Sequence, residues 1–344
     1  MIPATPRSVR YHAIGKPEDV LQYDSLPEDA RAPAAGEALV LLEMAVIHPS
    51  DLGMIGGTYG RLRPLPAVAG REGVGRVAKI GAGVASLKPG DRVRMPEDSG
   101  AWREALVARA DSLIQVPADL PASQMAMAII NPPTAWLLLH EFVDLKPGDW
   151  IIQNASNSAV GECVVQMARA LGLRTACLVR SPEKHGANLR AMGADIVLAD
   201  DDKALKAVQS QIAQMGGAPP RLALNSVGGM SAITLTRALG PNGQLITFGG
   251  MTGDAIRFPT REFIFKNAAM RGFWMDRWAR AAAPGALCAV CEAVFARIRD
   301  GSLRMTVDSV YPLSEYAAAL ARAAAYGRDG KVLLRGPAGT ETKN

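Results

Sequence analysis

The sequence predicts a two-domain α/β protein in which a β-rich domain of barrel type accompanies a doubly wound parallel sheet. Its length of 344 residues is enough for two domains. Residues 35–120 contain short runs rich in β-forming residues, separated by turns. From about Ser123 onwards strand-like runs alternate with helical patterns, which is typical of a parallel sheet covered by helices on both faces.

The β-rich part holds four expected strands, each bounded by turn-forming residues. They are 37–46, 73–80, 91–95 and 101–107. The turn Lys88-Pro89-Gly90-Asp91 separates two of them, because proline and glycine supply the backbone angles that tight turns need. We therefore expect residues 1–126 to form one compact β domain.

The second domain is expected from residue 127 to residue 275. Its strand candidates are 150–153, 174–179, 195–198, 221–226, 243–248 and 269–274. After Trp274 the pattern predicts a helix, a strand, a second helix and a last strand, at 285–300, 307–311, 314–326 and 331–334. We expect this tail, residues 276–344, to fold back and complete the first domain.

The composition excludes several classes of function. Hydrophobic residues make up 49% and charged residues 21% of the chain, as in ordinary globular proteins. The net charge of +5 is spread along the chain, so nucleic acid is not an expected partner. No apolar run reaches the roughly 20 residues that span a bilayer. Residues 1–16 lack the apolar core of a signal peptide and the four cysteines suit a reducing compartment, so we expect a cytoplasmic protein without a membrane segment.

A βαβ unit in the middle of the chain predicts a nucleotide cofactor. The strand 150–153 runs into a turn of small residues, 154–161, and the helical pattern 163–171 and the strand 174–179 complete the unit. The N-terminus of such a helix commonly holds the pyrophosphate of a dinucleotide.

Two details refine this prediction. The fingerprint G-x-G-x-x-G is only partly present, because Ser156 and Ser158 occupy the first two glycine positions and Gly161 the third. The following strand ends at Arg180, where chains that bind NAD usually place Asp or Glu to hold the ribose 2′-hydroxyl. Because a guanidinium suits a 2′-phosphate, we expect NADPH. The alternative is that Arg180 is a solvated residue at a strand end.

The order of the motifs resembles the medium-chain dehydrogenase/reductase superfamily over nearly the whole chain. The general motifs are Gly70-Arg71-Glu72-Gly73-Val74-Gly75, Leu87-Lys88-Pro89-Gly90-Asp91-Arg92-Val93 and the βαβ unit. Three further segments are similar to the 2-enoyl thioester reductases of mitochondrial-type fatty acid synthesis: His48-Pro49-Ser50-Asp51 with Gly57-Thr58-Tyr59-Gly60, then Gln153-Asn154-Ala155-Ser156-Asn157-Ser158-Ala159-Val160-Gly161, then Arg271-Gly272-Phe273-Trp274.

This resemblance implies a GroES-like catalytic domain, a Rossmann domain that binds NADPH, and specific site residues. Tyr59 is implied as the catalytic tyrosine. The residues implied to line the cofactor and substrate cleft come from six segments: Asn131; Asn157, Ser158, Ala159 and Val160; Arg180, Ser181 and Pro182; Phe248, Gly249, Gly250 and Met251; Phe273, Trp274 and Met275; and Lys331.

Three departures from the family pattern bear on the chemistry. Ala159 stands where the turn commonly has glycine, and the segment 181–184 is less basic than the family suggests. His48 replaces the usual Asn, at a position where zinc-dependent relatives place a cysteine ligand. The partner position holds Arg71 instead of His, and Asn131 offers no thiolate. Since catalytic zinc needs three protein ligands, we expect no metal.

Tyr59 suits the expected reaction. Reduction of a 2-enoyl thioester needs hydride at C3, stabilisation of the oxygen that gains charge, and a proton at C2. A tyrosine stays protonated at neutral pH and can donate. Tyr59 lies in the glycine-flanked segment 56–60, which presents its ring. The alternative is a loop tyrosine that packs on a neighbour. His48 either positions substrate or caps a turn, and Phe273 and Trp274 can also belong to the core or a dimer interface.

The sequence therefore predicts an NADPH-dependent, zinc-independent reductase of an enoyl thioester. The enoyl group of this substrate is attached to coenzyme A or to acyl carrier protein. A quinone oxidoreductase of the same superfamily is the first alternative. A relative that only binds nucleotide and has no activity is the second, and Tyr59 argues against it. A homodimer joined through strand 269–274 is also expected.

Overall fold

The computed structural model describes residues 2–25 and 32–339. The chain forms two compact units: unit 1 consists of Met1–Ile129 and Thr306–Asn344, and unit 2 of Ile130–Met305. The chain was expected to return to the first domain at residue 276, but it returns to unit 1 only at Thr306, because residues 276–305 belong to unit 2. Their helix α11 (Ala286–Arg299) buries Val294 and Phe295 and packs against α4 (Asn131–His140), where Arg297 covers the ring of Trp136.

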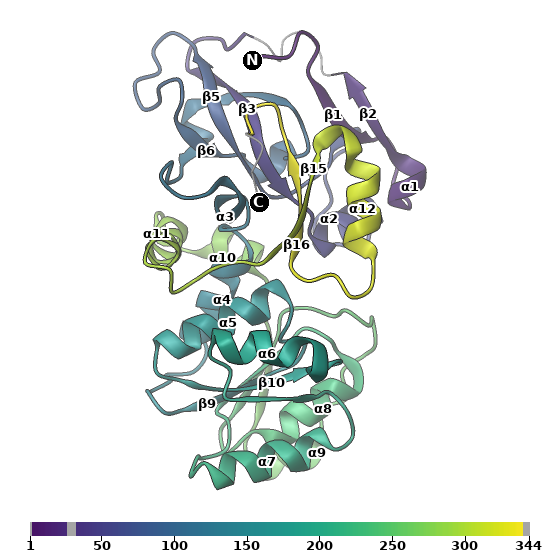
Figure 1. The fold of residues 1–344 in the computed structure, drawn as a ribbon, viewed down its shortest axis with the longest axis vertical. Helices are drawn as coiled ribbons and strands as arrows, with labels where there is room; N and C mark the ends of the chain where they lie inside the picture. Colours follow the sequence, from purple (N-terminus) through teal and green to yellow (C-terminus); the bar gives the residue numbers. More distant parts are fainter. Residues whose placement is uncertain (1, 26–31, 340–344) are drawn as a thin grey trace. The chain divides into compact units, whose positions relative to one another are not determined.

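Unit 1 is built around two sheets and a few short helices (Figure 1). A three-stranded sheet has the order β2-β1-β4, with bounds Leu21–Ser25, Arg7–Tyr11 and Ala67–Val68. A seven-stranded sheet has the order β15-β16-β3-β5-β6-β8, with β7 also paired to β3. Its bounds are Val307–Pro312, Lys331–Arg335, Glu37–Val46, Gly73–Ile80, Arg92–Arg94, Ile114–Gln115 and, for β7, Ala105–Arg109.

The short helices of unit 1 are α1, α2, α3 and α12, at Pro17–Val20, Pro49–Ile55, Ala122–Met125 and Tyr316–Ala324. Single 3₁₀ turns lie at Glu97–Ser99, Ala110–Ser112 and Leu313–Glu315. The return of β15 and β16 beside β3 agrees with the expected fold-back of residues 307–334. Strand β3 lies in the core of unit 1, because nine of its ten residues are buried.

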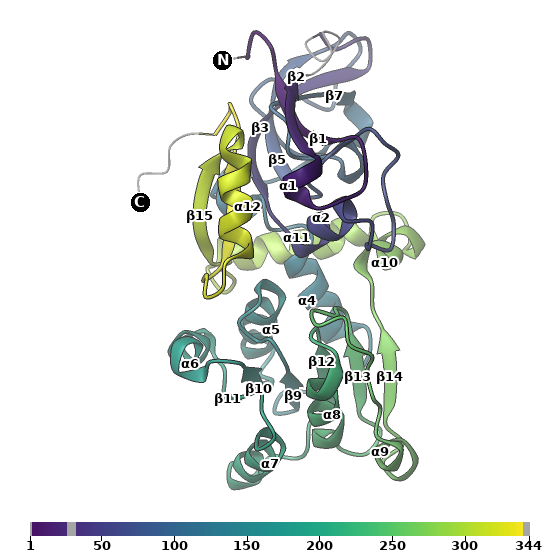
Figure 2. The same cartoon turned by 90° about the vertical axis from the view of Figure 1, so that its right-hand side faces the viewer.

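Unit 2 is a parallel sheet of six strands in the order β11-β10-β9-β12-β13-β14 (Figure 2). From β9 to β14 the strands are Trp150–Gln153, Arg174–Val179, Ile196–Ala199, Leu222–Asn225, Gln244–Thr247 and Ala269–Gly272. After β9 the chain moves first to one side and then to the other. This reversal is the topological switch point at which doubly wound sheets bind ligands beyond the carboxyl ends of the strands. The expected fold class is confirmed.

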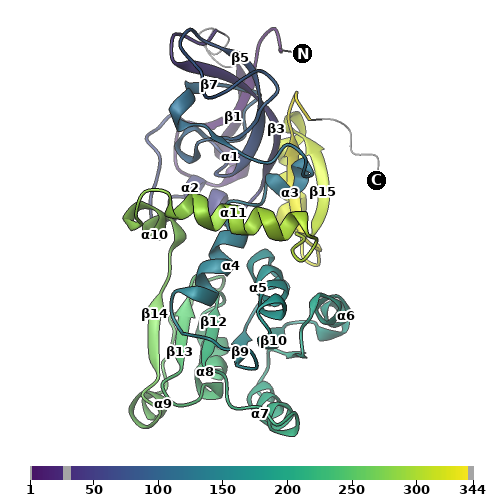
Figure 3. The same ribbon diagram turned by 90° about the vertical axis from the view of Figure 1, so that its left-hand side faces the viewer.

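Helices cover both faces of this sheet (Figure 3). On one face, α5 and α6 bury Val165 and Leu189 against Cys177 and Val197. On the other face, α7 and α8 bring their apolar residues against Ile152 and other strand residues. These four helices span Ala159–Ala170, Pro182–Met192, Ala204–Gln214 and Gly229–Ala238, and the shorter α9 and α10 span Thr260–Phe265 and Met275–Ala281. Over residues 2–25 and 32–339 no helix combines the length and the apolar character that crossing a bilayer requires.

Candidate active site

The turn between β9 and α5 is compact although serines replace two glycines. Ser158 caps α5 by accepting a hydrogen bond from the backbone N–H of Gly161 at 3.2 Å. Ser156 donates its hydroxyl to the backbone oxygen of Gln153 at 3.1 Å. A Cβ atom at Gly161 would lie 2.5 Å from the backbone oxygen of Ser156, so only glycine fits there. The turn thus delivers the N-terminus of α5 to the switch point, where backbone N–H groups of its first turn can bind a pyrophosphate.

A network of polar side chains links the ends of four strands. Asn154, after β9, donates to Asn225 Oδ1 at 2.7 Å and to the hydroxyl of Ser231 at 2.8 Å. Ser231 donates in turn to Asp200, after β11, at 2.6 Å, and Asn225 donates to Thr247 of β13 at 3.2 Å. Burial raises the pKa of Asp200. Sequence reasoning missed this network. Its only signal was a polar residue at the end of each apolar strand.

Most of the expected cofactor residues in unit 2 lie at this same edge. Arg180 is exposed and directly follows β10, while Ser181 is the N-cap residue and Pro182 the first residue of α6. The amide nitrogen of Asn157 lies 3.3 Å from Nε2 of His185, also on α6. Ala159 and Val160 form the first turn of α5.

The loop after β13 and the segment after β14 complete the edge. The segment 248–251 lies against the end of β12, since Phe248 N–H donates to Asn225 and Met251 N–H to Ser226, both at 3.0 Å. A Cβ atom at Gly249 would approach the backbone of Ser226 to 3.1 Å, whereas one at Gly250 meets nothing within 4 Å. Phe273 N–H donates to Thr247 at 2.8 Å, and Trp274 and Met275 begin α10.

Two of the expected residues lie elsewhere. Asn131 starts α4 and is 7% exposed, and its amide nitrogen is a buried donor without a hydrogen-bond partner in the part of the chain that the structure describes. A buried donor left open in this way suits a ligand oxygen. Lys331 belongs to unit 1, where it begins β16, and its charge acts on His48.

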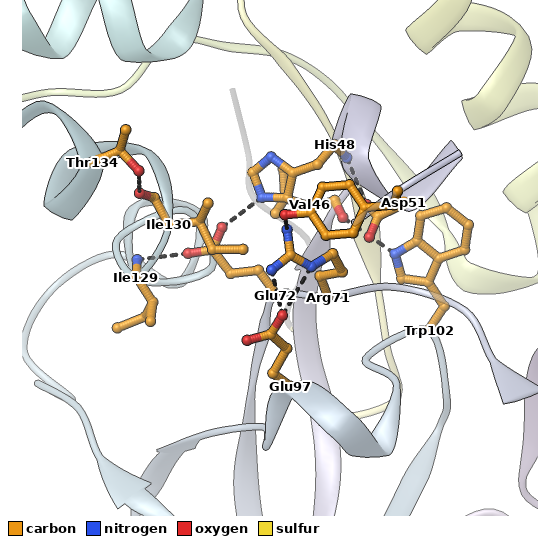
Figure 4. Close-up of polar contacts among 11 residues, drawn as sticks. Val46, His48, Asp51, Arg71, Glu72, Glu97, Trp102, Ile129, Ile130 and Thr134 are labelled. Atoms are coloured by element: carbon orange, nitrogen blue, oxygen red, sulfur yellow. Dashed lines mark hydrogen bonds and ion pairs between the residues drawn. The ribbon is translucent and has the colours of Figure 1, made fainter. Parts of the chain in front are cut away.

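His48 sits at the start of α2 in a buried polar cluster of unit 1 (Figure 4). Its Nε2 lies 2.6 Å from Oε2 of Glu72, and the other oxygen of Glu72 accepts from the backbone N–H of Ile129 at 2.6 Å. Burial, together with the charges of Lys331 and Arg71, lowers the pKa of His48 to about 3. The imidazole is therefore neutral at physiological pH, and its Nε2–H can donate to the Glu72 carboxylate. Both carboxylate oxygens of Glu72 therefore have a hydrogen-bond partner.

Tyr59 follows α2 in a tight loop. The backbone N–H groups of Thr58 and Tyr59 both donate to the backbone oxygen of Gly53, at 2.8 and 3.1 Å. The ring is partly exposed, and the phenol oxygen accepts a hydrogen bond from Nη1 of Arg71 at 2.6 Å. The position of Arg71 in the sequence motif did not reveal this contact with Tyr59. Over residues 2–25 and 32–339 no group of three or more His, Cys, Asp or Glu side chains is arranged to hold a metal ion.

Comparisons with known proteins identify the family. Residues 34–118 match the model of the alcohol dehydrogenase GroES-like domain, and residues 159–288 match that of the zinc-binding dehydrogenases. The chain is 38% identical over 338 residues to the mitochondrial enoyl-[acyl-carrier-protein] reductase of Dictyostelium discoideum, covering 96% of this chain and 95% of that protein. The human enzyme of the same name is 38% identical over 323 residues, covering 92% and 85% of the two chains.

Solved structures agree. The Etr1p complex with NADP and crotonyl-CoA superposes with a TM-score of 0.89 at 30% identity, covering 97% of this chain and all of that one. The Etr1p/Etr2p heterodimer from Candida tropicalis, a mitochondrial 2-enoyl thioester reductase, gives 0.87 at 30% identity, covering 97% and 100%. A putative NADPH:quinone reductase from Bacillus thuringiensis gives 0.85 at 27% identity, covering 97% and 99%.

One prediction from the sequence was wrong. A cytoplasmic location was expected, whereas the curated relatives described above are named as mitochondrial enzymes. The composition could not decide this, because a soluble surface and reduced cysteines suit every aqueous reducing compartment alike. The motifs, the paired domain models and the relatives along nearly the full length agree with one another. The chain belongs to the 2-enoyl thioester reductase family of the medium-chain dehydrogenase/reductase superfamily.

Proposed function

We propose that this protein reduces the 2,3-double bond of an enoyl thioester with NADPH. One observation carries the proposal: along 97% of its length the chain superposes on a reductase described in complex with NADP and crotonyl-CoA. The match to a quinone reductase is weaker in both TM-score and identity. Quinone reduction therefore remains only the alternative to be tested.

The residues at the edge of unit 2 suit NADPH. The N-terminus of α5, beside the N–H group that Ser158 caps, can bind the pyrophosphate, and Arg180 at the end of β10 can pair with a 2′-phosphate. Asn131 offers a buried amide nitrogen that has no hydrogen-bond partner among residues 2–25 and 32–339. When bound, NADPH supplies the hydride for C3 of the substrate. The loop 248–251 and the segment 273–275 are proposed to hold the rest of the cofactor, and Lys331 of unit 1 the substrate or cofactor.

Unit 1 supplies the acid. Once C3 receives a hydride, the electrons of the double bond collect at C2 and the thioester oxygen, so a proton donor is needed there. Tyr59 is a partly exposed phenol on a loop whose backbone is pinned to Gly53. We propose that its hydroxyl donates this proton. No metal takes part in the proposal. His48 is hydrogen-bonded to Glu72, and Arg71 is hydrogen-bonded to Tyr59 and Glu97.

We further propose a homodimer, with acyl groups carried by coenzyme A or acyl carrier protein as substrates in fatty acid synthesis. Among the residues that the structure describes, β14 pairs only with β13, and Met270, Arg271 and Gly272 are exposed. Such an edge is normally covered. Light scattering of the purified protein measures the mass in solution, and a monomer at micromolar concentration would contradict this part.

The enzymatic proposal is tested by following NADPH absorbance with crotonyl-CoA and, separately, with a quinone. We expect turnover with crotonyl-CoA, and Tyr59→Phe should lower kcat by about 10²–10⁴-fold with little change in NADPH binding, since the ring remains and only the donor is lost. Turnover of the quinone alone would select the alternative. Binding of NADPH without turnover of either substrate would point to a protein that only binds nucleotide.

A further inference from the structure

Arg71 holds the hydroxyl group of Tyr59 directly. Its Nη1 donates to the phenol oxygen at 2.6 Å, and its guanidinium carbon lies 4.6 Å from the centre of the ring. The Arg71 side chain is only 3% exposed, so the guanidinium side of the contact is buried. A contact of this kind fixes the position of the phenol oxygen as well as the plane of the ring.

Glu97 fixes the other edge of the same guanidinium (Figure 4). Nε of Arg71 donates to Oε1 of Glu97 at 3.0 Å, and Nη2 donates to the same oxygen. Glu97 is held in turn, since its backbone oxygen accepts a hydrogen bond from Arg63. A guanidinium bound along one edge cannot turn away, so Nη1 stays directed at Tyr59.

We infer that Arg71 is the positioning residue for the proton that Tyr59 delivers, an inference that rests on the proposed enoyl thioester reduction. A guanidinium carries five N–H donors and no acceptor. In its contact with Arg71 the phenol oxygen must therefore accept, and the hydrogen of Tyr59 must point elsewhere. The contact thus keeps the hydroxyl of Tyr59 in the role of a donor.

The same contact acts during the proton transfer. The O–H bond of Tyr59 breaks and its electron pair stays on the phenol oxygen, while the electrons of the enolate form the new C2–H bond. The phenolate then recovers a proton from water. Negative charge arises on the atom that already accepts from Arg71, so the contact changes from a cation facing a neutral oxygen to a cation facing an anion, which adds a full Coulomb attraction. Arg71 consequently stabilises the transition state more than the ground state.

A cycle of variants separates this role from a merely structural one. We expect Arg71→Met to lower kcat for crotonyl-CoA about ten- to hundredfold, because one hydrogen bond to a charged group is lost. KM should change by no more than about threefold. In the Tyr59→Phe background the same substitution should cost less than about twofold, since its effect passes through the missing hydroxyl. Arg71→Lys should recover part of kcat by restoring the charge. Equal losses of kcat in both backgrounds, or no loss at all, would overturn the inference.

A titration tests the inference without turnover. The ultraviolet phenolate signal of Tyr59 is obtained as the difference between wild type and Tyr59→Phe, and again between Arg71→Met and the double variant. We expect this signal to appear about one pH unit or more higher when Arg71 is absent. The other charged or titratable groups of this cluster are present in all four proteins: Glu97, Glu72, Asp51, His48, Arg63, Tyr11 and Lys331.

The two proposals fail in different ways. Absence of crotonyl-CoA reduction by the wild type refutes the proposed function, and the titration still decides whether Arg71 acts on Tyr59. An unshifted phenolate signal refutes the role of Arg71 while leaving the function intact. If Arg71→Met does not fold, Arg71→Lys and Glu97→Gln provide the comparison. Glu97→Gln removes the charge that holds the guanidinium, and it should lower kcat less than Arg71→Met and again only when Tyr59 is present.

Discussion

Removal of the Glu72 carboxylate should destabilise unit 1 severely. In Glu72→Ala both the Nε2–H of His48 and the backbone N–H of Ile129 lose their acceptor. The two residues are 3% and 2% exposed, so water does not replace the lost oxygens. A buried donor left without a partner costs about 1–3 kcal/mol, which gives about 2–6 kcal/mol for the pair. With about 2–4 °C per kcal/mol for a unit of this size, Tm should fall by roughly 4–24 °C.

Glu72→Gln is the informative comparison. Its one carbonyl oxygen can accept from Ile129, and its amide can donate to Nε2 of His48 once the imidazole proton moves to Nδ1. Both donors then keep a partner, and the loss should stay below about 2 kcal/mol. Glu18→Ala, an exposed position of unit 1, should change stability by less than about 0.5 kcal/mol. Thermal unfolding followed by circular dichroism measures all three. If the Ala and Gln variants melt together, the two orphaned donors are not the cause and the reasoning is refuted.

Three further predictions concern the cofactor, acid stability and metal content. Arg180→Ala should raise KM for NADPH about ten- to hundredfold and leave KM for NADH nearly unchanged; equal use of both cofactors by the wild type would contradict it. Hydrogen bonds from Arg322 hold the pKa of Asp308 at about 2, below its ordinary 3.8, so this stabilisation is present above about pH 4 and lost as pH falls towards 2. The Tm difference between wild type and Asp308→Asn should accordingly shrink between about pH 5 and about pH 2.5, and a constant difference would show that ionisation plays no part. Elemental analysis should find no stoichiometric zinc, and activity should persist in chelator; zinc lost together with activity would refute this.

Several strands could be predicted from the sequence to the residue. The expected strands 37–46, 73–80, 150–153 and 174–179 coincide with β3, β5, β9 and β10. The expected strand 101–107 is displaced to β7, Ala105–Arg109. Trp102 explains the error, because its ring is fully buried and its indole donates to Val46 from a segment that is not a strand. Apolar residues alone do not distinguish a strand from a loop that crosses the core.

The pattern also could not assign residues 276–305 to a unit. An apolar stripe on α11 shows that the helix packs on something, but both units offer apolar surfaces. The same limit applies to the site. The segment around Tyr59 was identified through the family resemblance, whereas its contact with Arg71 depends on the path of the chain between them. The network of Asn154, Asn225 and Ser231 joins residues more than 70 positions apart, and no local pattern encodes such pairs.

The polar network of unit 2 has a consequence for how cofactor preference could be redesigned. It joins the ends of β9, β11, β12 and β13 through side chains, while Arg180 projects from the end of β10 as an exposed residue. The position that we propose to select between the two nicotinamide cofactors is therefore not a member of this network. Exchange of residue 180 therefore leaves every hydrogen bond of this network in place.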